Sequence, residues 1–598
     1  MNLKKLLLSS AGAAVMLTAH AGLENLTGEF RNGQLFLQWK ESELAANTRL
    51  SVWSSDAPIT KDNVKNATQI ASMLNVNSAR DWWLDADSFV IKRSKKAKGE
   101  EIFAGDVADV GAQKKKAKGF VIKDNGKGIS PDGGLHVHTP WKEVTGKRYY
   151  AVTAHKGSAE DVLDIASTAQ AIEVTEGKAS PIKMRGRLNR NSAKGMPLII
   201  SLHGRGGGVG VDKKGNAIGT HIIYSDKNTA WREGIAFKFS ANIRKDNVLY
   251  ISLNDRVWIG RKLTRKESSD SRDYVPAIST FWLGYNVNIA KSNEGPKFVW
   301  DNYTERLILH IIKWAQEYLG ADVNRTYITG GSMGGTGTVQ MVTHFPEVFA
   351  AGRAQVPIYA FSWKTFGNKG RGSAWRMTCS IGQFTKQNPA VMPDGRELVD
   401  YTNGAKNINR PAVDMPPLLA TNGRKDASIP WVNNPDFYRG ANEGRQMFQV
   451  FWNNGDHGMS RHCPKGFITE KEMMRYRLNE SFPAFSNFSD NKNYGNGNFR
   501  EGDLIGWINR GIDWKVIADT PDRYEIDLSV NHKDIKYPVT SDVTIRRRQQ
   551  FKPAKGAVVT VEINGNKQNV SIDKDGLLTI EKIAFADAKP VKVICTIK

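Results

Sequence analysis

The feature that most constrains this chain is a serine flanked by glycines near its middle. Residues 327–335 read Tyr-Ile-Thr-Gly-Gly-Ser-Met-Gly-Gly, which gives Gly-x-Ser-x-Gly at Gly330, Ser332 and Gly334. β-prone residues precede this motif and a helical pattern follows it, so we expect the serine on a sharp turn between a strand and a helix. A Cβ at either glycine would collide with neighbouring backbone. Such a turn displays the hydroxyl at the edge of a sheet, as a nucleophile for acyl transfer requires.

The sequence around the motif favours this interpretation over a simpler one. In a chain with 55 glycines, the same residues could instead form a glycine-rich helix start with Ser332 as its N-cap. Upstream, however, residues 301–319 place apolar side chains at helical spacing, and Gly320 is positioned to end that helix. Downstream, residues 336–344 predict a second helix. Helix, strand, turn and helix therefore occur in the order that a displayed nucleophile needs.

The first residues have the pattern of a secretory signal. Lys4 and Lys5 precede an apolar run over residues 6–17, and Ala-His-Ala at 19–21 matches a cleavage site. The run is shorter than the roughly 20 apolar residues that span a bilayer, so a cleaved signal over residues 1–21 is favoured over a retained anchor. We find no other candidate span. We expect an exported protein, extracellular or periplasmic, without stable membrane insertion.

At 598 residues the chain is too long for one ordinary core, and several domains are expected. Residues 22–178 form the first, with short β-type segments that alternate at 34–39 and carry paired tyrosines at 147–154. This Trp strand followed by a Tyr-Tyr-Ala-Val strand resembles a fibronectin type III β-sandwich. A long, basic, glycine-rich stretch at 92–134 departs from that pattern and is interpreted as an insertion or a loop.

Residues 179–490 alternate apolar strands with helical patterns, which is typical of a largely parallel sheet covered by helices. The strand segments are almost continuously apolar, as expected where both faces of a strand are buried. These expected strands are 196–202, 248–253, 325–329, 417–421 and 448–452.

Residues 491–598 return to β-type patterns after a loop rich in Asn, Gly and Ser at 486–498. Strands are expected at 524–530 and 558–563. Asn564-Gly565 follows the second of these at once, which is a strong signal for a hairpin turn. We expect a small C-terminal β-sandwich.

The chain is strongly basic, with a net charge of +23 and basic runs at 92–98, 114–116 and 546–548. The simplest interpretation is solvated loops on the surface of an exported protein. The alternative is attraction to a polyanion such as an acidic polysaccharide, the cell envelope or nucleic acid. No zinc finger, RNA-binding aromatic motif or recognition-helix pattern accompanies the charge, so nucleic acid is the least favoured partner.

The chain has only 3 cysteines, which excludes a disulfide framework. Cys379–Cys463 is the favoured pair, because Cys463 lies near a histidine of the candidate site. Cys595 stands in an alternating apolar stretch and is expected to be a buried hydrophobe. Neither the cysteines nor the short pair His136 and His138 has the spacing of a metal site.

A displayed serine needs an acid and a base from later loops. Asp426 follows the expected strand at 417–421 and is the candidate acid, although a surface aspartate paired with a neighbouring cation is the simpler alternative. Asp436 is the second choice. Asp414 precedes the strand, at its wrong end, and Asp456 is adjacent to the candidate base, where side chains on a turn usually diverge.

The candidate base is His457, in the turn-rich loop after the expected strand at 448–452. A solvated loop histidine is the simpler alternative, but the position after this strand favours a base. His462 is close enough to compete. His344 lies in the helix after the serine and should face away from the turn.

The candidate donors for a developing oxyanion come from backbone amides. The strand at 196–202 ends in His203-Gly-Arg-Gly-Gly-Gly, and glycines there let amides approach a substrate oxygen. We assign one donor to the amide of Arg205 and the other to the amide of Met333. His203 itself is expected to be structural. A phosphate-binding loop is disfavoured, because no Gly-Lys-Ser/Thr ends the glycine run.

With these motifs together, the central region resembles the esterase branch of the α/β-hydrolase superfamily, near feruloyl esterases, acetyl xylan esterases, polyhydroxybutyrate depolymerases and prolyl-oligopeptidase-like hydrolases. The matched segments are 203–207, 327–335, 422–430 and 455–458. The resemblance implies an α/β-hydrolase core with a mostly parallel sheet between β-sandwich domains, the triad Ser332, Asp426 and His457, and neither a metal nor a cofactor. Residues 209–301, rich in aromatic and charged side chains, depart from the pattern and are interpreted as a lid or a substrate wall.

The expected activity is therefore that of a secreted serine ester hydrolase acting on polymer-linked esters, with an anionic polysaccharide as the favoured substrate class. A polyester depolymerase and a prolyl-oligopeptidase-like peptidase are the alternatives with the same triad, although no β-propeller repeat is recognisable. A binding or adhesion protein that keeps the fold without catalysis is the alternative from another class.

Overall fold

The computed structural model of the chain describes residues 22–79 (without 32, 33 and 46), 122, 127–138 (without 131), 145–156, 161–175, 188, 190, 192–205, 239–258, 277–286, 298–366, 377–458 (without 383), 463, 464 and 467–597. The expected signal segment and the basic runs at 92–98 and 114–116 lie outside these residues. Among the helices that are described, none is long and apolar enough to cross a membrane.

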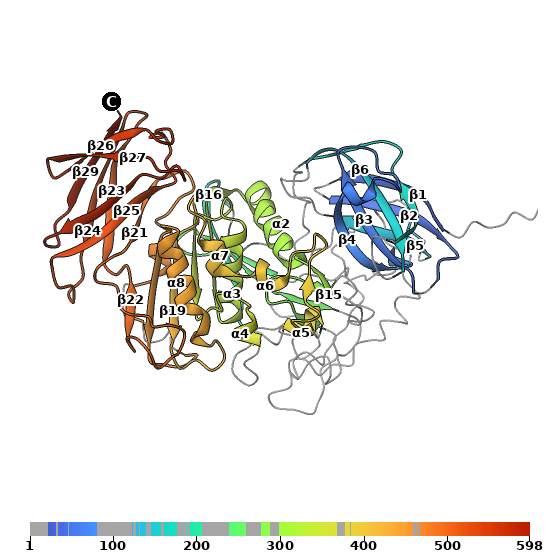
Figure 1. The fold of residues 1–598 in the computed structure, drawn as a ribbon, viewed down its shortest axis with the longest axis horizontal. Coiled ribbons are helices and arrows are strands. Elements are labelled where there is room, and N and C mark those ends of the chain that lie inside the picture. Colours follow the sequence, from blue (N-terminus) through green and yellow to red (C-terminus); the bar gives the residue numbers. More distant parts are fainter. Residues whose placement is uncertain are drawn as a thin grey trace, which may run out of the picture.

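The N-terminal strands, a central sheet with its helices and the C-terminal strands follow one another along the long axis of the molecule (Figure 1). The N-terminal strands form one sheet with the order β1-β2-β5 and another with the order β4-β3-β6-β7, where β8 also pairs with β6. Their bounds are β1 Gly22–Arg31, β2 Gln34–Ser42, β3 Arg49–Ser55, β4 Thr68–Asn75, β5 Gly133–His138, β6 Gly146–His155, β7 Val162–Ser167 and β8 Ile172–Val174. Buried side chains of both sheets share one apolar cluster. The resemblance to fibronectin type III stays a prediction.

Strand β2 is buried on both faces rather than on one, which differs from the alternation expected at 34–39. Leu35, Leu37 and Trp39 pack into the cluster shared by the two sheets. Phe36, on the opposite face, packs into a second apolar cluster with Leu135. The sequence pattern missed this cover because it comes from chain segments far from β2 in sequence.

The central sheet has eight strands in the order β10-β11-β9-β16-β17-β19-β20-β22. Every neighbouring pair from β11 to β20 is parallel, and the edge strands β10 and β22 are antiparallel to their neighbours. The bounds are β9 Met196–Leu202, β10 Phe239–Ile243, β11 Leu249–Leu253, β16 Ala321–Gly331, β17 Ala351–Gln355, β19 Leu418–Gly423, β20 Phe448–Asn453 and β22 Gly506–Ile508. All the strands expected for this region are present. Parallel strands deliver the loops at their carboxyl ends to one edge of the sheet.

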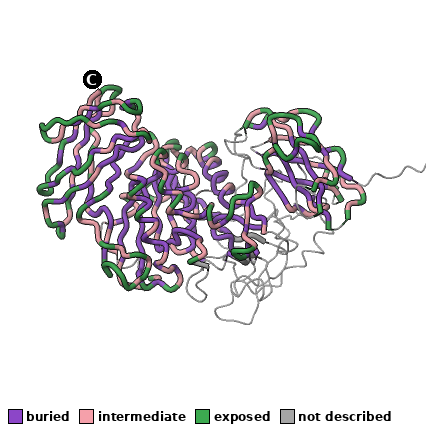
Figure 2. Tube along the Cα trace, in the orientation of Figure 1, coloured by how far each residue is buried: buried purple, intermediate pink, exposed green. Residues whose placement is uncertain are grey.

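The longer described helices, α2 (Tyr303–Tyr318), α3 (Met333–His344) and α8 (Asn434–Glu443), share one apolar cluster with the sheet. Ile200 of β9 and Ile328 of β16 point into it. Much of this region is buried in Figure 2. The remaining short elements are η1 Val64–Asn66, β12 Arg256–Trp258, β13 Ala277–Ser279, β14 Tyr285–Asn286, β15 Phe298–Asp301, α4 Trp363–Phe366, α5 Thr378–Ile381, β18 Ala390–Val391, α6 Leu398–Tyr401, α7 Gly404–Ile408, η7 Trp431–Asn433 and α9 Glu470–Met473.

The other face of the central sheet contacts residues 468–476, which include α9, and these share an apolar cluster with the C-terminal strands. Ile199, Tyr327, Leu419 and Phe451 point to this face and belong to the same apolar cluster as the C-terminal core. Those strands form sheets with the orders β21-β25-β28 and β23-β24-β29-β26-β27. Their bounds are β21 Phe482–Ser486, β23 Ile512–Asp519, β24 Arg523–Val530, β25 Val539–Arg546, β26 Val558–Ile563, β27 Asn566–Ser571, β28 Thr579–Phe585 and β29 Val591–Ile597. Asn564 and Gly565, both at positive φ, join β26 to β27, so the predicted hairpin is confirmed.

The chain crosses between these sheets around the loop at 486–498. β21, which precedes the loop, pairs with β25 of a C-terminal sheet. β22, which follows it, pairs with β20 at the edge of the central sheet. A boundary at residue 490 therefore does not separate the two sets of strands. β21 precedes it and pairs with a C-terminal strand, and β22 follows it and pairs with a central strand.

The basic run at 546–548 is not a solvated loop, and that prediction was wrong. Arg546 and Arg547 are both buried. Arg547 donates from Nη1 and Nη2 to the backbone carbonyls of residues 350 and 349, each at 2.8 Å. Arg546 Nε lies 2.9 Å from Asp414 Oδ1. The run thus joins the C-terminal strands to loops of the central region.

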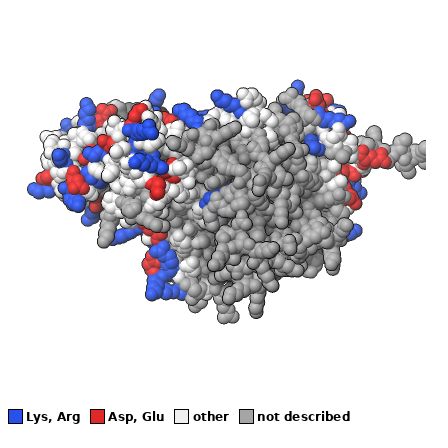
Figure 3. All heavy atoms as spheres, turned by 90° about the horizontal axis from the view of Figure 1, so that it is seen from below, with Lys and Arg blue, Asp and Glu red and all other residues white. Residues whose placement is uncertain are grey.

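Charges of both signs are mixed on the C-terminal lobe, as the face in Figure 3 shows. Some arginines of the described chain are paired with carboxylates of the C-terminal strands and loops: Arg445 lies 2.5 Å from Asp573, and Arg475 lies 2.6 Å from Asp513.

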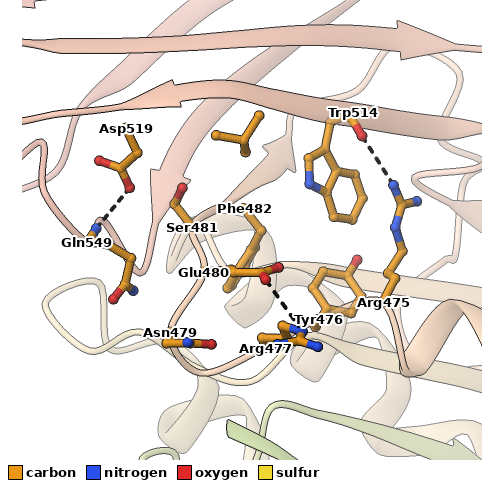
Figure 4. Close-up of a pocket in the computed structure, with 11 residues that line it drawn as sticks. Arg475, Tyr476, Arg477, Asn479, Glu480, Ser481, Phe482, Trp514, Asp519 and Gln549 are labelled. Atoms are coloured by element: carbon orange, nitrogen blue, oxygen red, sulfur yellow. Dashed lines mark hydrogen bonds and ion pairs between the residues drawn. The ribbon is translucent and has the colours of Figure 1, made fainter.

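A half-open cavity of about 460 Å³ lies where the C-terminal strands meet residues 475–482. The Arg475 guanidinium carbon is 3.7 Å from the ring centroid of Trp514, and the Tyr476 ring lies 5.2 Å from the same indole (Figure 4). These side chains pack on one another across the junction, and none of the candidate triad lines the cavity.

The disulfide favoured from the sequence is absent. Cys463 is a free cysteine, and its Sγ donates to Phe467 O at 3.4 Å. Burial raises the pKa of this thiol to about 11. Cys595 is free and buried in the C-terminal core, which confirms the prediction of a buried hydrophobe.

Arg547→Met keeps much of the side-chain length and removes the donors. Because the carbonyls of residues 349 and 350 would stay buried without the guanidinium, we expect the free energy of unfolding to fall by about 3 kcal/mol. Urea unfolding of the full chain measures this, with exposed Arg500→Met as the control. Equal unfolding midpoints in both variants would contradict the structural role of the run.

Candidate active site

Ser332 occupies the turn between β16 and α3, as the sequence predicts. β16 ends at Gly331 and α3 begins at Met333. Ser332 has φ 58° and ψ −121°, a conformation that a residue with a Cβ rarely adopts. Its N–H donates to Gln355 O at 2.8 Å, and its carbonyl accepts from Thr336 N–H at 2.9 Å. The surrounding backbone therefore holds the serine in a strained conformation.

The flanking glycines let this turn approach its neighbours. A Cβ at Gly330 would lie 2.4 Å from the carbonyl of Gly334, and a Cβ at Gly334 would lie 2.0 Å from Leu202 O. Gly331 differs, because the nearest atom to its Cβ would be 3.8 Å away. The motif glycines are thus required by contact with β9 and α3, whereas the glycine between them is not.

Ser332, His457 and Asp426 lie in one hydrogen-bonded row. His457 Nε2 is 2.8 Å from Ser332 Oγ, and His457 Nδ1 is 2.6 Å from Asp426 Oδ2. Asp426 is buried, whereas 40% of the His457 side chain is exposed. The residues follow β16, β20 and β19, whose carboxyl ends meet at one edge of the sheet. The structure therefore brings the three sequence-predicted side chains together.

The Asp426 carboxylate is fixed on both oxygens. Oδ1 accepts the backbone N–H groups of Ser428 and Ile429 at 2.8 and 2.9 Å. Oδ2 is then left to face the imidazole of His457. This arrangement orients the ring with one nitrogen toward the acid and the other toward Ser332.

The acid loop and the histidine loop are also joined through their backbones. Arg424 N–H donates to Asn453 O, and Lys425 N–H donates to Gly455 O, both at 2.9 Å. A Cβ at Gly423 would lie 2.4 Å from the carbonyl oxygen of residue 456. The acid loop and the histidine loop are therefore fixed to each other.

The pKa of His457 is raised above its ordinary value, chiefly by the hydrogen bond to Asp426. The charges of Asp426 and Asp456 act in the same direction, and burial acts against them. An imidazole in this environment accepts a proton more readily than a free one, which suits a general base near neutral pH.

The other candidates lie elsewhere. Asp414 pairs with buried Arg546, and Asp436 is a partly exposed residue of α8 whose Oδ1 lies 3.2 Å from Arg439. Asp456 accepts the N–H of residue 458 rather than contacting the imidazole. The side chain of His344 is 6% exposed, with Nδ1 2.7 Å from Glu305 Oε1. His462 lies outside the described residues.

The loop that carries Arg205, one of the two predicted oxyanion donors, lies against the nucleophile. A Cβ at Gly204 would be 3.5 Å from the Cβ of Ser332. Arg205 is buried, with its guanidinium carbon 5.2 Å from the ring centroid of Phe281. Residues 206–208, the rest of the glycine run, lie outside the described residues. The roles of the Arg205 and Met333 amides stay predictions.

A buried carboxylate that no sequence motif singles out supports this loop. Asp255 accepts the Ser279 hydroxyl at 2.6 Å and the Thr280 N–H at 2.8 Å through Oδ2, and its Oδ1 lies 3.3 Å from His203 Nε2. Trp282 Nε1 donates to His203 O at 3.1 Å. His203 is thus structural, as predicted. Asp255 follows β11 without a recognisable motif, so only the fold reveals it.

Two aromatic residues of the stretch 209–301, Trp282 and Tyr285, are core residues rather than parts of a substrate wall. Trp282 is fully buried beside Gly337, where a Cβ would lie 2.6 Å from the tryptophan Cβ. Tyr285 is buried and stacks on Tyr303, in the cluster shared with the N-terminal strands. Their burial corrects the prediction for these residues.

Metal-ligating side chains do not cluster in the part of the chain that the structure describes. No group of three or more His, Cys, Asp or Glu side chains there is arranged to hold a metal ion. The ring centroids of His136 and His138 are 6.4 Å apart in the N-terminal lobe. Burial, with a smaller contribution from Arg306, lowers the pKa of His138 to about 3, so this imidazole is neutral at physiological pH.

Residues 301–476 match the model of the prolyl oligopeptidase family. This stretch contains Ser332, Asp426 and His457. It is a serine hydrolase domain of the α/β-hydrolase type. The match covers less than half of the chain, and both β-rich ends lie largely outside it. No curated protein matches the chain.

Several solved structures of hydrolases are similar to the chain at low identity. An acetyl xylan esterase from Paenibacillus sp. R4 is 12% identical over 56% of this chain and 84% of that chain, with a TM-score of 0.29. An S-formylglutathione hydrolase from Agrobacterium tumefaciens is 10% identical over 54% and 86%, with a TM-score of 0.28. An acylaminoacyl peptidase is 13% identical over 75% of this chain and 54% of that chain, with a TM-score of 0.28. The chain thus spans about half of the peptidase, and these similarities favour neither activity.

The glycine contacts predict different outcomes for neighbouring substitutions. Because its Cβ would overlap Leu202 O, we expect Gly334→Ala to lower the free energy of unfolding by about 3 kcal/mol. Gly331→Ala, where the new methyl group has room, should change it by less than about 1 kcal/mol. Chemical denaturation compares the two, and equal losses would contradict the close approach at Gly334.

Asp426→Asn removes the charge that faces His457 and keeps the side-chain shape. Since the hydrogen bond to Asp426 is the main cause of the raised pKa, we expect the pKa of His457 to fall in this variant. NMR titration of the imidazole C–H resonances measures this, with His457→Gln to assign the signal and partly exposed Asp436→Asn as the control. An unchanged pKa would show that the Asp426 contact is not made in solution.

Proposed function

We propose that this protein is a serine hydrolase that cleaves carboxylic esters through an acyl-enzyme. The observation that carries the proposal is the row of hydrogen bonds from Ser332 Oγ through His457 to buried Asp426, at 2.8 and 2.6 Å. A hydroxyl is a weak nucleophile at neutral pH and reacts when an adjacent base takes its proton. The strained turn presents the hydroxyl to that base without further rearrangement.

In the first half of the reaction, Ser332 Oγ attacks the ester carbonyl carbon while its proton passes to His457 Nε2. Nδ1–H remains hydrogen-bonded to Asp426, whose negative charge stabilises the imidazolium and does not itself take the proton. His457 then gives its proton to the leaving alcohol oxygen, and the C–O bond breaks to leave an acyl-serine.

We assign the amides of Arg205 and Met333 as the hydrogen-bond donors that stabilise the negative charge developing on the carbonyl oxygen. Support comes from the contact between Gly204 and Ser332 and from the place of Met333 at the first turn of α3. Preorganised backbone donors of this kind contribute about 3 to 4 kcal/mol each to lowering the barrier.

In the second half, water takes the place of the leaving alcohol. His457 removes a proton from this water, and its oxygen attacks the acyl carbon. His457 returns the proton to Ser332 Oγ as the acid product leaves. The cycle uses only side chains and backbone amides of this chain.

We further propose that the protein is exported and acts on esters linked to a polymer, with an anionic polysaccharide as the substrate class. The signal-like pattern at residues 1–21 supports export, and the net charge of +23 supports an acidic substrate. The β-rich regions at both ends would hold the catalytic region near such a polymer.

A peptidase is the second candidate, and the observation that favours it is the match of residues 301–476 to the prolyl oligopeptidase family. The same triad cleaves an amide if His457 protonates the leaving amine. Parallel assays on acetyl, feruloyl, glucuronoyl and polyester substrates and on prolyl p-nitroanilides decide between the two. A higher kcat/KM on the anilides would replace the ester assignment by the peptidase one.

Ser332→Ala tests the nucleophile itself. We expect kcat/KM for p-nitrophenyl acetate to fall by about 10⁴-fold or more, because the hydroxyl that forms the acyl-enzyme is gone. A fluorophosphonate probe should label the parent at Ser332, located by mass spectrometry, and leave the variant unlabelled. Exposed Ser489→Ala is the control. Hydrolysis at the parental rate by folded Ser332→Ala would overturn the proposal.

A further inference from the structure

Arg424 is a buried cation two residues before Asp426, and the mechanism above does not use its side chain. It is 1% exposed. Its guanidinium faces residues 494–503, which we name the strap. The strap lies between β21, in a C-terminal sheet, and β22, at the edge of the central sheet. Its two ends are therefore held by different sheets.

Every N–H of the guanidinium meets a backbone carbonyl of the strap. A guanidinium has five N–H donors in a fixed planar fork: one on Nε and two on each terminal nitrogen. The acceptors are Phe499 O at 3.1 Å from Nε, Tyr494 O and Asp503 O at 3.5 and 3.3 Å from Nη1, and Asn498 O at 3.2 Å together with Glu501 O from Nη2. This one-to-one match fits arginine and not lysine, which has three donors around a point charge.

Two tryptophans of the catalytic region bind the strap beside Arg424. The guanidinium carbon lies 4.6 Å from the ring centroid of Trp431. Trp431 Nε1 donates to Tyr494 O at 3.2 Å, and Trp452 Nε1 donates to Asp503 O at 2.8 Å. Donors from η7, β20 and the acid loop thus converge on one segment.

Glycines in the strap allow its carbonyls to turn inward. Gly495, Gly497 and Gly502 have φ values of 71°, 108° and 84°. A Cβ at Gly502 would lie 2.6 Å from the carbonyl oxygen of residue 493. The strap is therefore shaped around the guanidinium.

The anchored side chain belongs to the loop that carries the acid. Arg424 N–H donates to Asn453 O, and Asp426 follows two residues later. The guanidinium of Arg424 therefore fixes the acid loop to the strap. The backbone N–H of Arg424 fixes the same loop to the histidine loop. A displacement of about 1 Å at a reacting group can cost about 100-fold in rate.

We propose that Arg424 is a positioning residue, which by binding the strap carbonyls holds the acid loop so that Asp426 stays within hydrogen-bond reach of His457. This inference rests on the proposed hydrolase function. The backbone of the strap, and the C-terminal strands that hold one of its ends, then support the acid loop.

The test is Arg424→Met in the full chain, which keeps an unbranched side chain and removes all five donors. With p-nitrophenyl acetate, we expect kcat to fall about 10- to 100-fold while KM changes less than about 3-fold, since the triad and not the substrate pocket is disturbed. The kcat of Arg424→Lys should lie between the kcat of Arg424→Met and that of the parent. Arg500→Met, an exposed arginine of the same strap, should match the parent.

The pH dependence separates a positioning role from a structural one. The described charged groups that face His457 are Asp426 on the acid loop and Asp456 on its own loop. The base must be neutral to act, so a weaker contact with Asp426 lowers the pKa of His457 and moves the acid limb of kcat/KM to lower pH. We expect this shift in Arg424→Met, in the same direction as in Asp426→Asn.

A folded Arg424→Met variant with the parental kcat, or with a reduced kcat and an unmoved acid limb, would overturn the inference. If that variant does not fold, the acid limb of kcat/KM is measured in Arg424→Lys and Gly502→Ala instead. An unmoved limb in both of these variants would also overturn the inference. A parent without hydrolysis or probe labelling would instead contradict the proposed function, which keeps the two failures apart.

Discussion

The strained turn at Ser332 is the constraint on which the rest of the site depends. A serine at φ 58° costs of order 1 to 3 kcal/mol, and the conformation persists because the structure around it leaves no alternative. The N–H of Ser332 is bonded to the last residue of β17, and Gly334 lies against the last residue of β9. The strands on either side of β16 therefore set the position of the hydroxyl. The loop with Arg205, one of the two predicted oxyanion donors, follows the same strand β9, so the register of β9 on β16 positions both this loop and the hydroxyl.

The second organising feature is that different elements pack on the two faces of the central sheet. Helices α2, α3 and α8 pack on one face, and the C-terminal strands share an apolar cluster with the other. β21 pairs with a C-terminal strand and β22, which follows it along the chain, pairs with a central strand. The two regions are therefore linked through their sheets. The loops at the carboxyl ends of β19 and β20 are thus supported by chain that follows them in sequence.

Buried arginines serve these contacts in a consistent way. Arg424 and Arg547 each donate mainly to backbone carbonyls rather than to carboxylates. A planar guanidinium can bind several carbonyls at fixed angles and remains charged when buried, which an ammonium group does less well. Part of the positive charge of the chain therefore joins segments internally, and it does not contribute to a surface for polyanions.

Local patterns in the sequence determined the strand, turn and helix around Ser332, the strands of the central sheet and the Asn564-Gly565 hairpin, because backbone preference and apolar periodicity act over neighbouring residues. The order of strand ends was enough to select Asp426 and His457 as partners. Only the tertiary structure decided that 546–548 is buried, that Cys463 is free, that Trp282 is core, and that Asp255 and Arg424 support the site. Each of these depends on contacts between residues distant in sequence. Such contacts form only when the sheets pack, and no local pattern records them.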